Sequence, residues 1–202
     1  MFIIGITGGS GAGKSSALRA LERLGALALD CDAVYHGLLA TDEGLKSELE
    51  TRFAGVLLSG EIDRRRLAAI VFSDPSALAD LNTITHKYVS AEIERLLAQW
   101  EQQGGTVAAI DAIALIQSGR SDRCNVVVGV TAPEDERISR IMERDALTLK
   151  QARQRISAQK PDNFYCENCD YILENFYESP AEFDDKCVEF FDKLIGGQLN
   201  AG

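Results

Sequence analysis

The segment at residues 8–15 reads Gly-Gly-Ser-Gly-Ala-Gly-Lys-Ser and matches the pattern G-x-x-x-x-G-K-[ST]. It follows the short apolar run at residues 2–6 and leads into a segment with helical periodicity, from Lys14 to about Leu24. Glycines allow a tight loop whose N–H groups converge on phosphate oxygens, and the positive end of the next helix adds to the same site. The pattern therefore predicts a P-loop in an α/β fold. A glycine-rich strand-to-helix turn with an exposed lysine is the structural alternative.

Each P-loop position has an expected role. The phosphates are expected to contact a continuous set of residues, namely Gly11, Ala12, Gly13, Lys14, Ser15 and Ser16. Lys14 reaches the β- and γ-phosphates and neutralises charge on the transferring group, and the Ser15 hydroxyl ligates Mg²⁺. This chemistry makes Lys14 a candidate catalytic residue and Ser15 a candidate metal ligand.

Charge and composition restrict the classes of partner. The 202 residues are 46% apolar and 26% charged, with a net charge of −10, which fits a globular domain. So acidic a chain argues against non-specific nucleic-acid binding and against docking on an anionic membrane. We therefore expect no nucleic-acid or membrane partner, and any polyanionic ligand must be held by locally placed cations.

The termini and cysteines indicate a cytoplasmic protein. The first residues carry no basic region, and their apolar run is too short for a signal peptide or a membrane span. Five cysteines are scattered through the chain, which favours reduced thiols over a disulfide framework. Cys166 and Cys169 form a single C-x-x-C pair, for which ordinary thiols are favoured over a structural zinc site.

Hydrophobic patterning predicts one α/β domain over residues 1–202. Five short buried strands are expected at residues 1–7, 26–30, 106–110, 126–131 and 171–173. Helical stretches separate them, so a parallel sheet with right-handed crossovers is the natural assembly. Residues 33–104 contain more helix than a crossover needs, with residues 67–72 packing at helical spacing. We interpret them as an inserted substrate-binding region.

Three aspartates follow predicted strands at the sheet edge that should carry the P-loop. Asp30 and Asp32 have i, i+2 spacing, which on an extended segment points both side chains to one side. One is expected to hold a water on Mg²⁺ and the other to accept a proton from a hydroxyl; a helix cap and a turn residue are the alternative. Asp111 is similar to a Walker-B acid, or is a strand-ending turn residue. Whether Asp30 or Asp111 serves the metal stays open.

Basic residues elsewhere are candidate phosphate contacts. Residues 133–160 predict two short helices with Arg137, Arg140 and Arg144 on the first and a Thr148 cap on the second. They are interpreted as a phosphate lid, with a solvated amphipathic hairpin as the alternative. Arg64 lies in a basic turn that could meet a phosphate, and His86 is either structural or substrate-binding.

Taken in order, the motifs resemble those of dephospho-coenzyme A kinases across nearly the full length. The matching pieces are Ile6-Thr7-Gly8-Gly9 leading to Gly13-Lys14-Ser15, Asp30-x-Asp32, Ile62-Asp63-Arg64 with Leu67-Ala68 and Val71-Phe72, Leu81-Asn82-x-Ile84-x-His86, Arg140 with Arg144-Asp145, Arg155-x-x-x-Gln159, and Asp170-Tyr171-Ile172 with Asn175. Two positions depart from the family. Lys87 stands where a proline is usual, and Gln117 stands where the family has a glutamate.

The resemblance implies a P-loop kinase three-layer sandwich with a five-stranded parallel sheet, a helical substrate-binding insertion and a helical lid. It implies transfer of the ATP γ-phosphoryl group to the ribose 3′-hydroxyl of dephospho-CoA, with ATP and Mg²⁺ required. The roles it implies place Asp32 at the 3′-hydroxyl, Arg64 and His86 on dephospho-CoA, Arg140 and Arg144 over the phosphates, Asn175 near the adenine, and Ser15 with Asp30 at the metal. A monomer is expected.

Other activities remain open from the sequence. Another P-loop nucleoside monophosphate kinase or small-molecule kinase is the nearest alternative, since the loop and lid alone do not separate these substrates. A nucleotide-dependent switch would need a guanine-reading Asn-Lys-x-Asp motif, which this sequence lacks. A non-catalytic relative is suggested only by the altered segment at residues 111–117.

Overall fold

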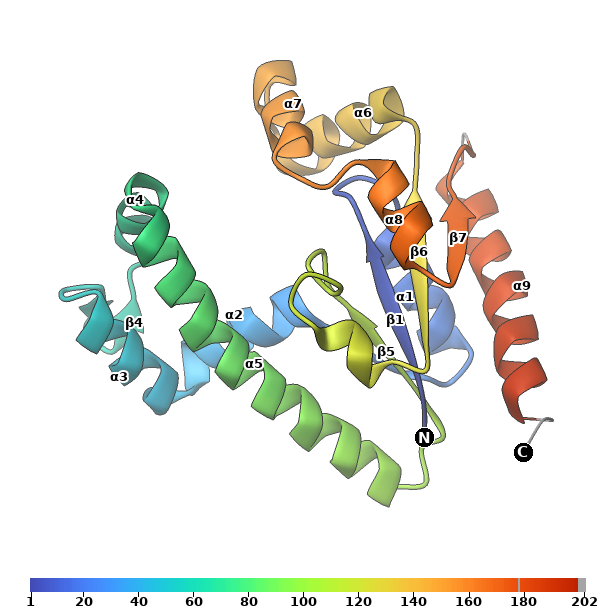
Figure 1. Cartoon of the computed structure of the whole chain (residues 1–202), viewed down its shortest axis with the longest axis horizontal. Helices are drawn as coiled ribbons and strands as arrows, with labels where there is room; N and C mark the ends of the chain where they lie inside the picture. The colour runs from blue at the N-terminus through green and yellow to red at the C-terminus, as the bar shows by residue number, and fades with distance from the viewer. Residues whose placement is uncertain (178, 200–202) are drawn as a thin grey trace. The chain divides into compact units, whose positions relative to one another are not determined.

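Strand β1 (Phe2–Gly8) is the central strand of a five-stranded sheet in the computed structural model, which describes residues 1–177 and 179–199 (Figure 1). The order across the sheet is β2 (Leu27–Asp30), β5 (Val107–Asp111), β1, β6 (Val126–Thr131) and β7 (Tyr171–Glu174). β1 pairs in parallel with β5 and β6, and β6 with β7. The five strands predicted from apolar runs are confirmed within one residue at each end.

The sheet belongs to the larger of two compact units, formed by Met1–Leu29 with Trp100–Gly202. Alternate residues of β1 face opposite sides of the sheet. Ile4 and Ile6 are fully buried against helices α1 (Lys14–Arg23) and α9 (Pro180–Leu199). On the other face, a Cβ added at Gly5 would lie 2.6 Å from Leu115. Both faces of the sheet are therefore covered.

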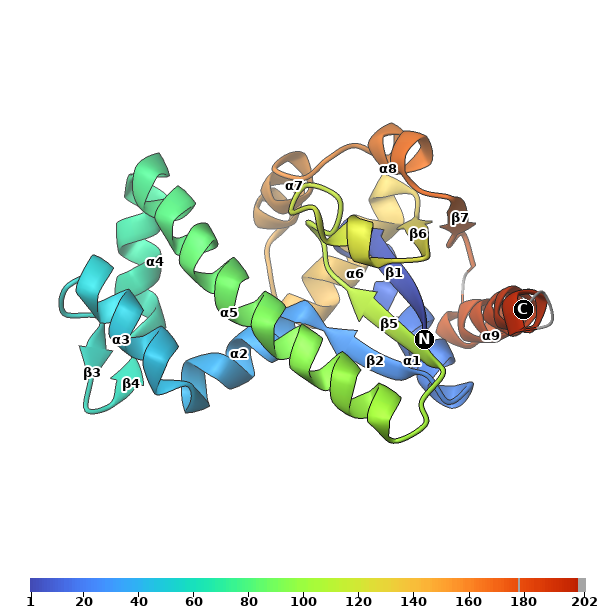
Figure 2. The same cartoon turned by 60° about the horizontal axis from the view of Figure 1, so that its bottom comes forward.

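The second face also carries α8 (Asp162–Asn168), which packs on β6. A Cβ at Gly129 would lie 3.4 Å from the Cβ of Tyr165, so glycine allows this close approach. Figure 2 shows α8 and α9 on opposite sides of the sheet, with a short 3₁₀ helix (Arg120–Arg123) near β5. The three-layer α/β arrangement predicted from the sequence is confirmed.

The lid region folds as predicted into α6 (Glu134–Asp145) and α7 (Leu149–Ser157). Thr148 caps α7: its hydroxyl accepts from the Gln151 N–H, and the Gln151 side chain accepts from the Thr148 N–H. This reciprocal pair satisfies two N–H groups that the helix start leaves without partners. The two helices share a small core of Ile138, Ile141 and Ala152.

The other unit is Asp30–Gln99, and it has its own hydrophobic core. It contains α2 (Cys31–Thr41), α3 (Glu43–Arg52), a hairpin of β3 (Leu57–Leu58) and β4 (Glu61–Ile62), α4 (Arg64–Ser73), and most of α5 (Pro75–Gln102). The helical character predicted for residues 33–104 is confirmed. Within the described residues, no helix combines the length and apolarity that crossing a membrane requires.

One packing prediction was wrong. Phe72, expected to pack with its neighbours on α4, is 86% exposed. Only one side of α4 is covered, and Leu67 and Val71 occupy it with i, i+4 spacing. Phe72 is one residue further along, about 100° around the helix, and therefore faces solvent.

The contrast between two phenylalanines gives a stability prediction. Phe191 on α9 is fully buried against the sheet, so Phe191→Ala should lower the free energy of unfolding by about 3–5 kcal/mol in urea denaturation. Phe72→Ala is the matched control and should change it by less than about 0.5 kcal/mol. Equal losses at both positions would contradict the packing described for α4 and α9.

Candidate active site

The loop between β1 and α1 offers the first turn of α1 no side-chain acceptor; within that turn the Ser16 N–H donates to the Gly13 carbonyl at 3.0 Å. The N-cap of α1 is Gly13, which offers no side-chain acceptor, and the first turn of the helix contains no acidic residue. Gly8, Gly11 and Gly13 have φ values of 143°, 77° and 115°, a region that favours glycine. Because a helix N-terminus attracts negative charge, this geometry suits a phosphate group.

Asn175 supports the loop from the C-terminal end of β7. Its side chain is 5% exposed, and its Nδ2 donates to the Ala12 carbonyl at 2.8 Å. Its own N–H donates to the Thr131 carbonyl, which fixes its position beside β6. A Cβ at Gly13 would lie 2.5 Å from this Nδ2 and 2.8 Å from Phe183. Asn175, predicted to lie near the adenine, thus also holds the loop backbone.

Arg137 and Gln159 support the same loop from the lid side. Arg137 is 4% exposed, and its Nε donates to the Ser10 carbonyl at 3.0 Å. Gln159, just after α7, accepts from the Ser10 N–H at 2.8 Å. Arg137 was predicted to be an arginine of a phosphate lid and Gln159 to be part of the family pattern, but their contacts with the loop backbone were not predicted. The spacing held a signal, because Arg137 precedes the core residue Ile141 by four positions and so falls on the buried face of α6.

Lys14 and the serines after it lie at the start of α1. The Lys14 ammonium donates to the Gly9 carbonyl at 3.3 Å, which places it over the loop. Ser15 is exposed. The Ser16 hydroxyl accepts from Arg19 at 3.0 Å. Lys14, Ser15 and Ser16 thus follow one another in the first turn of α1.

The two lid arginines of the prediction have different partners. Arg140 donates to the Gly11 carbonyl at 3.3 Å, so it contacts the P-loop, and its guanidinium lies 3.6 Å from Glu136. Arg144 forms a two-pronged pair with Asp145, with both distances 2.8 Å. Arg155 of α7 contacts the same carboxylate. Hydrogen bonding by Arg144 lowers the pKa of Asp145 to about 2. Asp145 therefore ties α6 to α7.

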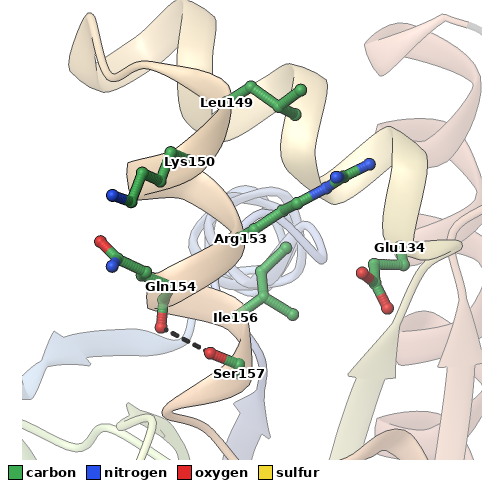
Figure 3. A pocket seen from close by; sticks show the side chains of 7 residues that line it. All are labelled: Glu134, Leu149, Lys150, Arg153, Gln154, Ile156 and Ser157. Carbon is green, nitrogen blue, oxygen red and sulfur yellow. Dashed lines mark hydrogen bonds between the residues drawn. The ribbon is translucent and has the colours of Figure 1, made fainter.

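A hollow of about 510 Å³ lies on the lid helices (Figure 3). It is lined by Glu134, Leu149, Lys150, Arg153, Gln154, Ile156 and Ser157. In Figure 3 the Arg153 side chain extends across it in the direction of Glu134. Most of its lining residues lie on α7, and Glu134 lies on α6.

The expectation that Asp30 and Asp32 share one side of an extended segment was wrong. Helix α2 begins at Cys31, so Asp32 lies in its first turn. Asp30 is the N-cap, and its Oδ1 accepts from the N–H groups of Asp32 and Ala33 at 2.8 and 3.1 Å. Aspartate is among the best N-cap residues. This geometry leaves Asp32 exposed at the helix start.

The remaining predicted residues lie in the Asp30–Gln99 unit, apart from Asp111. Arg64 is the first residue of α4, and its charge opposes the rise in the pKa of Tyr35 that burial causes. Tyr35 follows Asp32 by three positions on α2, so Arg64, Tyr35 and Asp32 occupy one region of this unit. His86 lies on α5. Asp111 ends β5 opposite Ile6, and is 9% exposed.

The described residues offer few side chains that could bind a metal ion. Among the described residues, no group of three or more His, Cys, Asp or Glu side chains could hold a metal ion. None of the five cysteines, all of which lie within the described residues, forms a disulfide. The oxygen donors Ser15 and Asp111, both in the larger unit, are of the type that Mg²⁺ prefers. A divalent ion here would need further oxygens from a phosphate ligand.

Comparison with known proteins points to one family. A dephospho-CoA kinase family model matches residues 2–180. The dephospho-CoA kinase of Geobacter sulfurreducens is 34% identical over 195 residues, 96% of this chain and 98% of the relative. The structure resembles Thermus thermophilus TT1252, with 30% identity, a TM-score of 0.82 and coverage of 98% and 97% of the two chains. It also resembles the dephospho-CoA kinase from Campylobacter jejuni, with 24% identity, a TM-score of 0.70 and coverage of 97% and 98%.

A substitution at Gly13 tests the loop geometry. Gly13→Ala should abolish measurable binding of a fluorescent ATP analogue, because the new Cβ meets Asn175 and Phe183 and the backbone has a positive φ. Gly197→Ala on α9 is the control, since its Cβ would point into open space. Nucleotide affinity should be unchanged in the control. Normal affinity in Gly13→Ala would contradict the loop conformation.

Proposed function

Since this chain belongs to the dephospho-CoA kinase family, we propose that it transfers the γ-phosphoryl group of ATP to the ribose 3′-hydroxyl of dephospho-CoA through the residues described above. The observation that carries the proposal is the uncapped, glycine-bounded start of α1, with Lys14 over the loop and Arg140 in contact with it. Phosphoryl transfer depends mainly on positioning and charge stabilisation, and this arrangement supplies both.

The loop residues bind the phosphates of ATP. Amides from Gly11 to Ser16 contact the phosphate oxygens, and Lys14 offsets charge that spreads over the transferring group. Asn175 binds the Ala12 carbonyl of the loop and is the residue proposed to lie near the adenine. The support for this assignment is that these residues converge on a single loop in the larger unit.

Residues of the smaller unit bind the acceptor. Asp32 is exposed at the start of α2, where its carboxylate orients the 3′-hydroxyl and takes its proton as the new bond forms. Arg64 binds a phosphate of dephospho-CoA, and His86 on α5 contributes a further contact. The influence of Arg64 on Tyr35, one turn from Asp32, supports a common site for Arg64 and Asp32.

The lid arginines contact the phosphates during transfer. Arg140 already touches the loop carbonyl of Gly11, so a small rotation of its side chain would bring it onto a phosphate. Arg144 would have to leave Asp145, or share it with Arg155, to do the same. Closing these side chains over the phosphates also excludes water, which would otherwise accept the phosphoryl group.

Magnesium is the proposed metal. When bound, Mg²⁺ would supply positive charge that offsets the negative charge of the phosphates. Ser15 offers a hydroxyl oxygen, and Asp111 at the end of β5 offers a carboxylate in the same unit. Asp30, in the other unit, uses one carboxylate oxygen to cap α2, and its role at the metal remains a prediction from the sequence. A cytoplasmic location, a monomeric state and the absence of nucleic-acid partners remain predictions from the sequence.

An acceptor assay tests the activity. ADP release should require dephospho-CoA, ATP and Mg²⁺ together, and the product should carry the new phosphate on the 3′-oxygen, as measured by mass spectrometry and phosphorus NMR. Nucleoside monophosphates and shikimate serve as competing acceptors. Faster turnover with one of these would replace the proposal with another small-molecule kinase activity. ATP binding without any turnover would indicate a non-catalytic relative.

Asp32→Asn tests the proposed base. Its kcat should fall by about 10²–10⁴-fold, because the amide cannot take the hydroxyl proton, while the KM for ATP stays nearly constant. Asp74→Asn is the control, since Asp74 is an exposed aspartate that caps α5 and asparagine can also cap. A kcat within a few-fold of the parent enzyme in Asp32→Asn would remove Asp32 from the mechanism.

A further inference from the structure

Arg137 is an arginine buried behind the P-loop, on the side of α6. All three parts of its guanidinium have partners: Nε donates to the Ser10 carbonyl at 3.0 Å, Nη1 to Asp162 at 3.0 Å, and Nη2 to Gln159 at 3.3 Å. Asp162 is the first residue of α8. A buried guanidinium is tolerated only when its charge is paired and its donors are satisfied. Its position is therefore well defined.

Gln159 completes the contacts with Ser10. Its Oε1 accepts from the Ser10 N–H at 2.8 Å, and its Nε2 donates to the Ser10 hydroxyl at 2.7 Å. Together with Arg137, it binds the N–H, the carbonyl and the hydroxyl of one loop residue. Ser10 is 6% exposed. Its polar groups are thus used for holding the loop from behind rather than for binding a ligand.

Arg137 also sets how close the loop can approach α6. A Cβ added at Gly9 would lie 2.6 Å from the Arg137 Cζ, and one added at Gly11 would lie 2.7 Å from the Arg137 carbonyl oxygen. Two glycines of the P-loop therefore pack directly on this residue. Gly11 also has a positive φ, whereas Gly9 does not. Glycine is required at position 9 only because a side chain there would collide with the Arg137 guanidinium.

We propose that Arg137 is a positioning residue that holds the P-loop in its phosphate-binding form before ATP arrives. Through Gln159, after α7, and Asp162, at the start of α8, it links the loop conformation to the lid helices. This inference rests on the proposed function and deepens it. Arg137 touches the loop backbone, so it acts on ATP through that backbone. Preorganising the amides removes an ordering cost from nucleotide binding.

A double-mutant cycle on nucleotide binding tests the proposal. Gly9→Ala alone should raise the Kd of a fluorescent ATP analogue about tenfold or more, because its methyl group displaces the guanidinium. Arg137→Met, which removes the charged fork but keeps the apolar stem, should raise it by a similar factor. In the double variant the methyl group has room, so its Kd should match that of Arg137→Met. If the Kd of the double variant instead rose by the product of the two single-variant factors, the two residues would act independently and the proposal would be overturned.

Further readouts separate positioning from general stability. Arg137→Met should raise the KM for ATP and leave the KM for dephospho-CoA unchanged, and Arg137→Lys should recover part of the affinity. Tyr165→Phe is the control, because among the described residues its buried hydroxyl has no hydrogen-bond partner. A lowered melting temperature with unchanged nucleotide affinity would mean that Arg137 is only structural.

Failure of the proposed function can be distinguished from failure of the proposal for Arg137. Nucleotide binding needs no acceptor, so a parent protein that binds the analogue but does not phosphorylate dephospho-CoA would refute the proposed function alone. Should Arg137→Met fail to fold, Gln159→Met takes its place: it removes both contacts with Ser10 without emptying a charged site, and should also raise the Kd. Parent-like affinity in Gln159→Met would contradict the proposal.

Discussion

The start of α1 is the constraint on which the rest of this structure depends. Most helices in the chain satisfy their first N–H groups with a side chain, as Asp30 does for α2 and Thr148 does for α7. Helix α1 begins after a glycine and has no such acceptor at its N-cap. Without a capping side chain, the first turn of such a helix is a favourable place for an anion. The positive-φ glycines Gly8, Gly11 and Gly13 precede this helix end, and Arg140 contacts the loop at Gly11.

The glycine loop is held by side chains from distant parts of the sequence. Asn175 binds Ala12 from the end of β7, and Arg137 with Gln159 binds Ser10 from the lid side. These contacts use the carbonyls of Ala12 and Ser10 and the N–H of Ser10, and none uses an N–H in the first turn of α1. The loop is therefore fixed on its rear surface, which leaves the helix N-terminus free for a ligand. Such rear support is what allows a flexible glycine sequence to adopt one conformation.

Sequence patterns predicted the elements well but not the contacts between them. Buried strands such as β6 and the capped helix α7 follow from local periodicity and local hydrogen bonding, so their bounds could be read directly. Asp30 and Asp32 were misplaced because a strand pattern and an N-cap compete over the same few residues. Arg137 was grouped with Arg140 and Arg144 as a candidate phosphate contact, and its burial could not be predicted because it depends on Asp162 and Ser10, partners that only the folded chain brings together. The prediction that Phe72 is packed was wrong because local hydrophobicity does not reveal which face of a helix other residues cover.

The side chains of Phe183 and Asn175 lie directly against Gly13, although more than 160 positions separate them from it in the sequence. During synthesis on the ribosome, the glycine loop emerges among the first residues and these two among the last. Domains fold as units while synthesis proceeds from the N-terminus. A nascent chain that still lacks its final strand and helix can therefore contain the whole motif and yet have no finished pocket. The glycine motif therefore needs β7 and α9, which are synthesised later, to complete the surroundings of Gly13.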